Sequence, residues 1–64
     1  MNKKINLTYI GIDFLINVEL DKNGEIVKVT QVKAWNDDQD KYIKIPCDLD
    51  AFLKEMGVLL RGKL

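Results

Sequence analysis

The apolar residues near the N-terminus alternate with polar ones, and the phase of this alternation changes at Gly11. The apolar residues are Ile5, Leu7 and Tyr9 before the glycine, and Phe14, Ile16, Val18 and Leu20 after it. A period of two is typical of strands that bury one face. A change of phase between two such strands predicts a tight turn, so we expect a β-hairpin across this segment.

For the register of this hairpin, we take Gly11 and Ile12 as the two central residues of the turn. Glycine at the first central position is the signature of a type II′ turn. All cross-strand pairs are then apolar and lie on one face, as packing between strands requires. The predicted pairs are Tyr9 with Phe14, Leu7 with Ile16, and Ile5 with Val18.

A second turn is predicted at Asn23 and Gly24, because both residue types tolerate a positive φ. Two registers remain open here, and both bury the same face. They pair Leu20 with Val27 and Val18 with Val29 in the first case, and Val18 with Val27 in the second.

In the third strand the apolar residues change from odd to even positions. They are Val27 and Val29, then Val32 and Ala34. A β-bulge near Thr30 and Gln31 would restore the alternation. Such a bulge also turns Trp35 away from the face that holds the preceding apolar residues.

The remaining chain predicts an acidic loop, a short strand and a helix. The loop covers residues 36 to 40, and residues 42 to 45 are compatible with a fourth strand that ends at Pro46. Asp48 is expected to cap the helix, with Cys47 and Phe52 forming a hydrophobic staple. We expect the helix to continue to about Arg61 and to end at Gly62. Its apolar stripe is Leu49, Phe52, Leu53, Met56 and Leu60.

These elements predict one α+β domain over residues 1–64, in which an antiparallel meander of three or four strands packs on one C-terminal helix. A chain of 64 residues is long enough for only one such two-layer unit. The predicted inner face of the sheet consists of Ile5, Leu7, Tyr9, Phe14, Ile16, Val18, Leu20, Val27, Val29 and Val32.

The charge balance and the single cysteine restrict the class of protein. Ten basic and ten acidic residues cancel, whereas proteins that bind duplex nucleic acid usually carry a positive excess. No apolar stretch approaches the length that spans a bilayer, so we expect no membrane partner. Cys47 cannot form an internal disulfide and no signal peptide is recognisable, which favours the cytoplasm.

The sequence predicts no enzyme and no cofactor. It contains no histidine, the commonest general base and zinc ligand. Cys47 has neither an imidazole nor a basic cluster beside it in the sequence, so a packing role is favoured over a nucleophilic one. The acidic loop lacks the central glycine and the terminal glutamate of a calcium-binding EF-hand, so no metal site is predicted.

A binding role has better support, from the predicted outer face of the sheet. This face is mostly polar, but it holds Ile10, Leu15 and Trp35 near one end. A clustered apolar patch with tryptophan indicates an interface. The alternative, that Trp35 folds over the edge of the core or under the acidic loop, remains open.

Two partners fit this patch. A second copy of the chain is the first, since a small domain without disulfide or metal often gains burial by self-association. The other is a single-stranded nucleic acid whose bases stack on Trp35 or Tyr42, with Lys28 and Lys33 beside the phosphates. Neutral net charge disfavours the nucleic acid. The predicted binding residues are Ile10, Leu15, Lys33, Trp35 and Tyr42.

The whole layout of hairpin, bulged third strand, acidic loop and helix resembles that of many small proteins of bacteriophages and mobile elements. The resemblance rests on the order of elements over the full chain and not on a diagnostic motif. It implies a non-enzymatic accessory protein that binds a host or phage protein and modulates it.

Overall fold

Four strands follow one another in the same order along the chain and along the sheet. The computed structural model describes residues 1–64. Every neighbouring pair of strands is antiparallel, in the order β1-β2-β3-β4. The predicted α+β meander with a C-terminal helix is thus confirmed, with the short fourth strand present. The elements are β1 (Asn2–Tyr9), β2 (Ile12–Leu20), β3 (Ile26–Asn36), β4 (Lys41–Lys44) and α1 (Leu49–Arg61).

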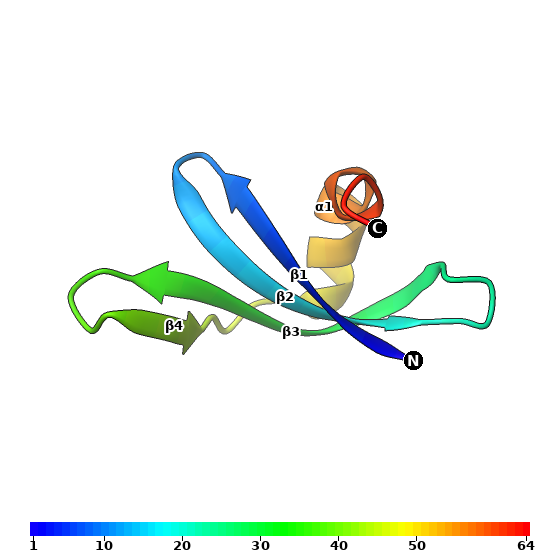
Figure 1. Ribbon diagram of the computed structural model, residues 1–64, viewed down its shortest axis with the longest axis horizontal. Coiled ribbons are helices and arrows are strands. Elements are labelled where there is room, and N and C mark those ends of the chain that lie inside the picture. Colours follow the sequence, from blue (N-terminus) through cyan, green and yellow to red (C-terminus); the bar gives the residue numbers. More distant parts are fainter.

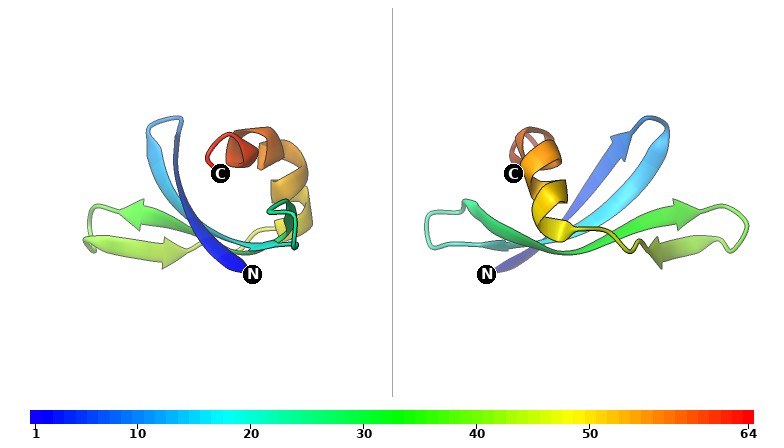
Figure 2. Two further views of the ribbon diagram at one scale, coloured as in Figure 1. Left: turned by 45° about the vertical axis from the view of Figure 1, so that its right-hand side comes forward. Right: turned by 180° about the vertical axis from the view of Figure 1, so that it is seen from behind.

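The helix covers one face of the sheet, and its contacts are mainly with β3. Figure 1 shows the β1–β2 hairpin rising away from the β3–β4 hairpin, so that the two hairpin tips point in different directions. The same divergence is visible from the two other sides in Figure 2. The molecule is elongated, with extents of 39 × 19 × 19 Å, and its long axis runs from the tip of the β3–β4 hairpin to the turn between β2 and β3 (Figure 1).

The core lies between the helix and the part of the sheet where β1, β2 and β3 run side by side. It contains seven buried apolar side chains, six from the predicted inner face and one from the helix stripe. Phe14 and Phe52 join the two layers by an edge-to-face contact with ring centroids 6.4 Å apart. The seven residues are Ile5, Leu7, Ile16, Val18, Val29, Val32 and Leu60.

The register of the first hairpin differs from the prediction by two residues. Tyr9 pairs with Ile12, so Leu7 faces Phe14 and Ile5 faces Ile16. A shift of two residues keeps every side chain on its predicted face, because side chains alternate with a period of two. The predicted pairs were wrong, but the predicted inner and outer faces of β1 and β2 were right.

The turn itself explains the difference. Its central residues are Ile10 and Gly11, with φ of 52° and 72°. Positive φ at both positions is the arrangement of a type I′ turn, whose twist matches that of the two strands. The sequence pointed to type II′ because glycine stood at the first central position of the assumed turn, Gly11-Ile12. A β-branched residue such as Ile10 rarely adopts a left-handed conformation, so the observed turn carries local strain.

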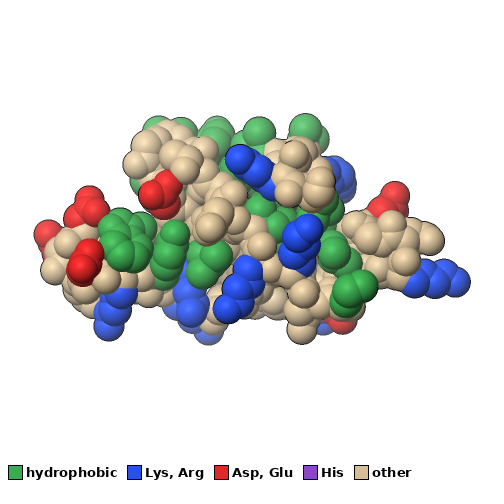
Figure 3. Space-filling view, viewed as in Figure 1, with side chains coloured by type: hydrophobic (Ala, Val, Ile, Leu, Met, Phe, Trp, Pro, Cys, Tyr) green, Lys and Arg blue, Asp and Glu red, His purple; other side chains and the backbone are tan.

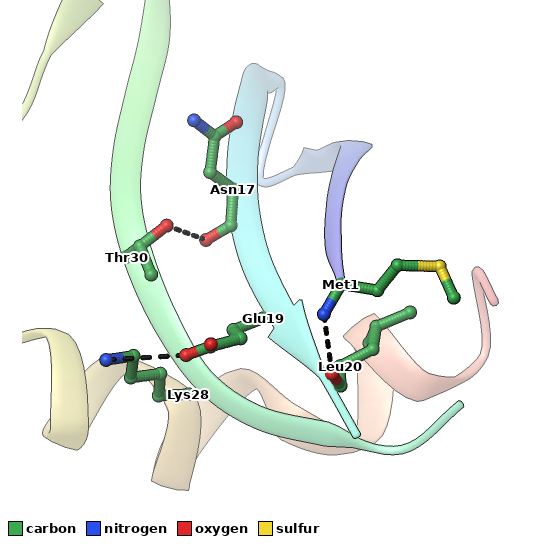
Figure 4. Close-up of polar contacts among 6 residues, drawn as sticks. All are labelled: Met1, Asn17, Glu19, Leu20, Lys28 and Thr30. Carbon is green, nitrogen blue, oxygen red and sulfur yellow. Dashed lines mark hydrogen bonds and ion pairs between the residues drawn. The ribbon is translucent and has the colours of Figure 1, made fainter. Parts of the chain in front are cut away.

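Two irregularities shape the pairing of β2 with β3. Val18 pairs with Val29, as one of the two predicted registers required. Thr30 has no partner between Val29 and Gln31, which confirms the predicted bulge. Figure 4 shows the Thr30 hydroxyl donating a hydrogen bond to the Asn17 carbonyl oxygen at 3.2 Å.

The second irregularity was not predicted. Leu20 pairs with Ile26 and Glu19 with Lys28, so Val27 is skipped by the ladder. Val27 is consequently exposed and does not belong to the inner face, contrary to the prediction. Ile26 packs against the core in its place. Tyr9 was also expected to be buried, but it is 41% exposed because it lies near the tip of the first hairpin.

The helix begins and ends as predicted. The Asp48 carboxylate accepts hydrogen bonds from the backbone amides of Asp50 and Ala51 at 3.1 and 3.2 Å. Gly62 closes the last turn by donating its backbone N–H to the carbonyls of Val58 and Leu60. The predicted staple is wrong in one respect, because Cys47 is exposed and cannot anchor the chain by burial.

Replacing the strained turn residue should stabilise the protein. Ile10 is 81% exposed, so Ile10→Asn loses little apolar burial, and Asn-Gly is the preferred pair in a type I′ turn. We expect the free energy of unfolding in urea to rise by about 1 kcal/mol. Ile12→Asn is the control, because Ile12 has no positive φ, and it should not stabilise the protein. An unchanged or lower stability of Ile10→Asn would contradict this account of the turn.

Leu60 should be the helix residue on which folding depends most. Its side chain is fully buried, whereas the neighbouring Leu59 is 42% exposed. Leu60→Ala should lower the free energy of unfolding by about 2–5 kcal/mol, because it leaves a cavity in a small core. Leu59→Ala should cost much less. Equal losses, measured by chemical denaturation, would show that the helix does not bury the face described here.

Candidate binding surface

The face of the sheet opposite the helix carries a row of side chains that crosses all four strands. Asn6 pairs with Leu15, Leu15 with Lys33, and Lys33 with Lys44. Residues that are directly opposite in neighbouring strands place their side chains on the same face. The row therefore sets Leu15 between Asn6 and Lys33, with Lys44 on the far side of Lys33, and Leu15 is half-buried.

A pair of aromatic rings lies next to this row, two residues closer to the loop between β3 and β4. Trp35 faces Tyr42 across the two strands, and their rings meet edge to face with centroids 5.2 Å apart. The Trp35 indole nitrogen Nε1 donates a hydrogen bond to Asp37 Oδ1 at 2.9 Å. The Trp35 side chain is thus held against Tyr42 and the acidic loop.

Trp35 nevertheless remains 38% exposed. The ring contacts the acidic loop, as one of the two interpretations held, and it lies on the outer face of the sheet. Its part in an interface stays a prediction. It does not belong to the core. We call the five outer-face residues that these two rows bring together the outer-face patch; they are Leu15, Lys33, Trp35, Tyr42 and Lys44.

The electrostatics of this face are set by lysines without acidic partners. The molecule has one salt bridge, between Lys28 Nζ and Glu19 Oε2 at 3.4 Å (Figure 4). Lys4, Lys33 and Lys44 have no carboxylate within 4.0 Å. Figure 3 shows lysines along one side of this face and hydrophobic side chains beside them, with acidic groups at the tip of the β3–β4 hairpin. The patch thus combines two unpaired lysines with Asp37, whose carboxylate is hydrogen-bonded to the Trp35 indole.

A shallow cleft of about 360 Å³ adjoins the outer-face patch. Residues from both faces of the β1–β2 hairpin line it, together with Tyr42 of β4 and Lys63 beyond the helix. Within it the Thr8 hydroxyl donates a hydrogen bond to the Asp13 carboxylate, so this carboxylate is bonded within its own hairpin. The lining residues are Asn6, Leu7, Thr8, Asp13, Phe14, Tyr42 and Lys63.

Ile10 lies apart from the other predicted binding residues. It occupies the turn between β1 and β2, and the tip of that hairpin diverges from the tip of the β3–β4 hairpin in all three ribbon views. The pairing of β2 with β3 ends at Phe14 and Ala34, so the strand pairing does not place Ile10 beside Leu15 and Trp35. Leu15, Lys33, Trp35 and Tyr42 do share one face.

Sequence reasoning did not single out Lys44. Its signal was present, because Tyr42 and Lys44 stand two residues apart in the short fourth strand and must share a face if that strand forms. The pairing of Lys44 with Lys33 then follows from the register of β3 with β4. Two lysines directly opposite each other repel, and a bound anionic group relieves that repulsion.

The structure gathers no cluster of three or more His, Cys, Asp or Glu side chains that could hold a metal ion. Cys47 is exposed at the start of the helix. No helix has both the length and the apolar character needed to cross a membrane.

Comparison with known proteins gives no relative: no family model, no curated protein and no solved structure matches the chain. The functional argument therefore depends on the geometry of the outer-face patch.

Removing Tyr42 should free the Trp35 ring. Trp35 is the only tryptophan, so its fluorescence reports on this site alone. We expect Tyr42→Ala to shift the emission to longer wavelength and to increase quenching by acrylamide, because the edge-to-face contact is lost. Tyr9→Ala, on the opposite face of the sheet, is the control. Unchanged quenching in Tyr42→Ala would show that the loop alone holds the ring.

Proposed function

We propose that this is a non-enzymatic binding protein whose outer-face patch recognises an acidic, partly apolar segment of another protein. The observation that supports this most is the combination of exposed Trp35 with Lys33 and Lys44 on one uncovered face. Tryptophan is over-represented among residues that dominate binding energy, and unpaired lysines attract carboxylates. Leu15 and Tyr42 supply further apolar contact area beside them.

The charge of the patch argues against a second copy of the chain as its occupant. In a two-fold dimer the same surface meets itself, so Lys33 and Lys44 would be brought against their own copies. Like charges in an interface are costly. The sequence suggested self-association through this face. The free edge of β1 is a better-supported surface for it.

A single-stranded nucleic acid is the second candidate. The Trp35–Tyr42 pair beside unpaired Lys33 and Lys44 has the components of a base-stacking platform with a track for phosphates. One observation makes it weaker than the protein reading. The chain has no net positive charge, whereas binding the successive phosphates of a nucleic acid usually requires a positive excess.

The resemblance to small bacteriophage and mobile-element proteins supports an accessory role in the cytoplasm. In that role the protein docks on a host or phage partner and modulates it without chemistry of its own. The small size fits such a role, because one exposed face is enough to block or bridge a site on a larger protein.

The proposal is tested with two fluorescein-labelled probes at low salt: a peptide of glutamate and leucine, and an oligothymidine of similar charge. We expect the peptide to bind and to perturb Trp35 fluorescence. Lys33→Glu and Lys44→Glu should each weaken binding by about tenfold, because attraction is replaced by repulsion. Lys54→Glu, at an exposed position on α1, is the matched control and should have little effect.

Trp35→Ala should also weaken peptide binding while the circular dichroism spectrum stays unchanged, since the ring lies outside the core. Binding of oligothymidine alone would support the second candidate and overturn the first. Peptide binding that is indifferent to Lys33→Glu and Trp35→Ala, or no binding of either probe, would contradict a role for this face.

A further inference from the structure

Strand β1 forms one edge of the sheet, and no other strand lies on its far side. It is eight residues long, contains no proline, and pairs with β2 without any register shift. Long, regular edge strands can pair with a further strand, and proteins commonly prevent this with prolines, bulges, charged side chains or short edges. Both edges of this sheet carry two lysines, but β4 has only four residues, whereas β1 continues for five residues beyond Lys3 and Lys4 without another charge.

The hydrogen bonds at the start of β1 show which of its backbone groups are free. The amino group of Met1 donates to the Leu20 carbonyl oxygen at 3.0 Å, and the Leu20 amide donates to the Met1 carbonyl oxygen at 2.6 Å (Figure 4). Met1 and Leu20 thus form a hydrogen-bonded pair. In antiparallel sheets such pairs alternate with pairs that are not hydrogen-bonded.

The odd-numbered residues of β1 are therefore bonded to β2, and the even-numbered ones direct their N–H and C=O groups toward the free edge. The outward-facing residues are Asn2, Lys4, Asn6 and Thr8. Their side chains lie on the outer face, so the edge is open to a strand in the plane of the sheet.

We propose that a second copy of this chain adds to this edge, with the two β1 strands antiparallel about a two-fold axis at Asn6. Asn6 then pairs with the same residue of the other copy, and polar Lys4 pairs with polar Thr8. Lys3 meets Tyr9, which is 41% exposed and not buried. Ile5 faces Leu7, so the inner face stays apolar across the junction. The paired residues are Asn6 with Asn6, Ile5 with Leu7, Lys4 with Thr8, and Lys3 with Tyr9.

Neighbouring registers fit less well. An axis at Ile5 sets Lys3 against the buried Leu7, and an axis at Lys4 brings the two copies of that lysine together. An axis at Leu7 pairs only five residues of each strand, against seven for the axis at Asn6. An axis that falls between two residues would pair odd-numbered with even-numbered positions. It would therefore place inner-face side chains opposite outer-face ones.

A second copy also suits the exposed surface of the monomer. The chain exposes 4723 Å², whereas a compact monomer of 7.4 kDa exposes about 4,200 Å². Joining two β1 edges makes one continuous sheet with both helices on the same face. The two outer-face patches then share the other face, so the dimer does not compete with the proposed binding function.

One side chain lies near the new junction. Lys63 lines the same cleft as Asn6, Leu7 and Thr8. Its side chain is exposed and makes no hydrogen bond or salt bridge, so this side chain can turn aside into solvent when a strand adds.

The register is tested by cysteine cross-linking in a Cys47→Ser background, which removes the exposed native thiol. Asn6→Cys should form a covalent dimer under mild oxidation, because the two Cα atoms of a hydrogen-bonded pair lie about 5.5 Å apart, within disulfide range. Thr8→Cys is the matched control on the same edge and face. Its two copies would be about 13 Å apart, so cross-linking should be at least about tenfold slower.

Reversible association is measured separately by sedimentation at protein concentrations up to about 1 mM, since few-residue strand pairing is weak. Asn6→Pro removes an outward N–H inside the paired segment and should abolish the dimer. Asn2→Pro removes an equivalent N–H group outside the paired segment and should leave the dimer intact. Equal cross-linking of the two cysteine variants, or a monomer at every concentration, would overturn the proposal whatever the outcome with peptide probes.

Discussion

A single helix has to cover the inner face of the whole sheet, and the rest of the structure follows from this limit. Helix α1 packs mainly on β3 and places one fully buried side chain, Leu60, in the core. The strands are longer than the helix can cover. The core is therefore confined to the part of β1, β2 and β3 that lies under the helix. The tip of the first hairpin carries half-exposed apolar residues such as Tyr9 and Ile12.

The divergence of the two hairpins gives the protein separate surfaces with different chemistry. The outer-face patch offers side chains: two aromatic rings, a leucine and two unpaired lysines. The edge of β1 offers backbone groups. Because these surfaces use different atoms, both can be occupied at once, and a dimer through β1 would present two patches on one sheet. Such an arrangement raises the effective affinity for a partner that carries two acidic segments.

The sequence was sufficient to predict the side on which most strand residues lie, because alternation has a period of two and survives a register error of two residues. It was not sufficient to predict the register of the first hairpin, since the turn places Ile10 in a conformation that isoleucine rarely adopts. The bulge at Thr30 could be predicted because the apolar residues change from odd to even positions there. The bulge at Val27 could not, because Val27 is apolar although it is exposed, so its position in the alternation wrongly indicated burial. Four of the five predicted binding residues share a face, but Ile10 does not join them, because alternation carries no information on where two hairpins diverge.

The meander order of the strands has a consequence for how the chain folds. Each strand pairs with the strands nearest to it in sequence, so every β-pairing closes a loop of only a few residues. Chains whose contacts are close in sequence fold quickly. The docking of α1 on β3 spans a longer stretch, so we infer that the sheet assembles first, turn by turn, and that the helix then fixes it.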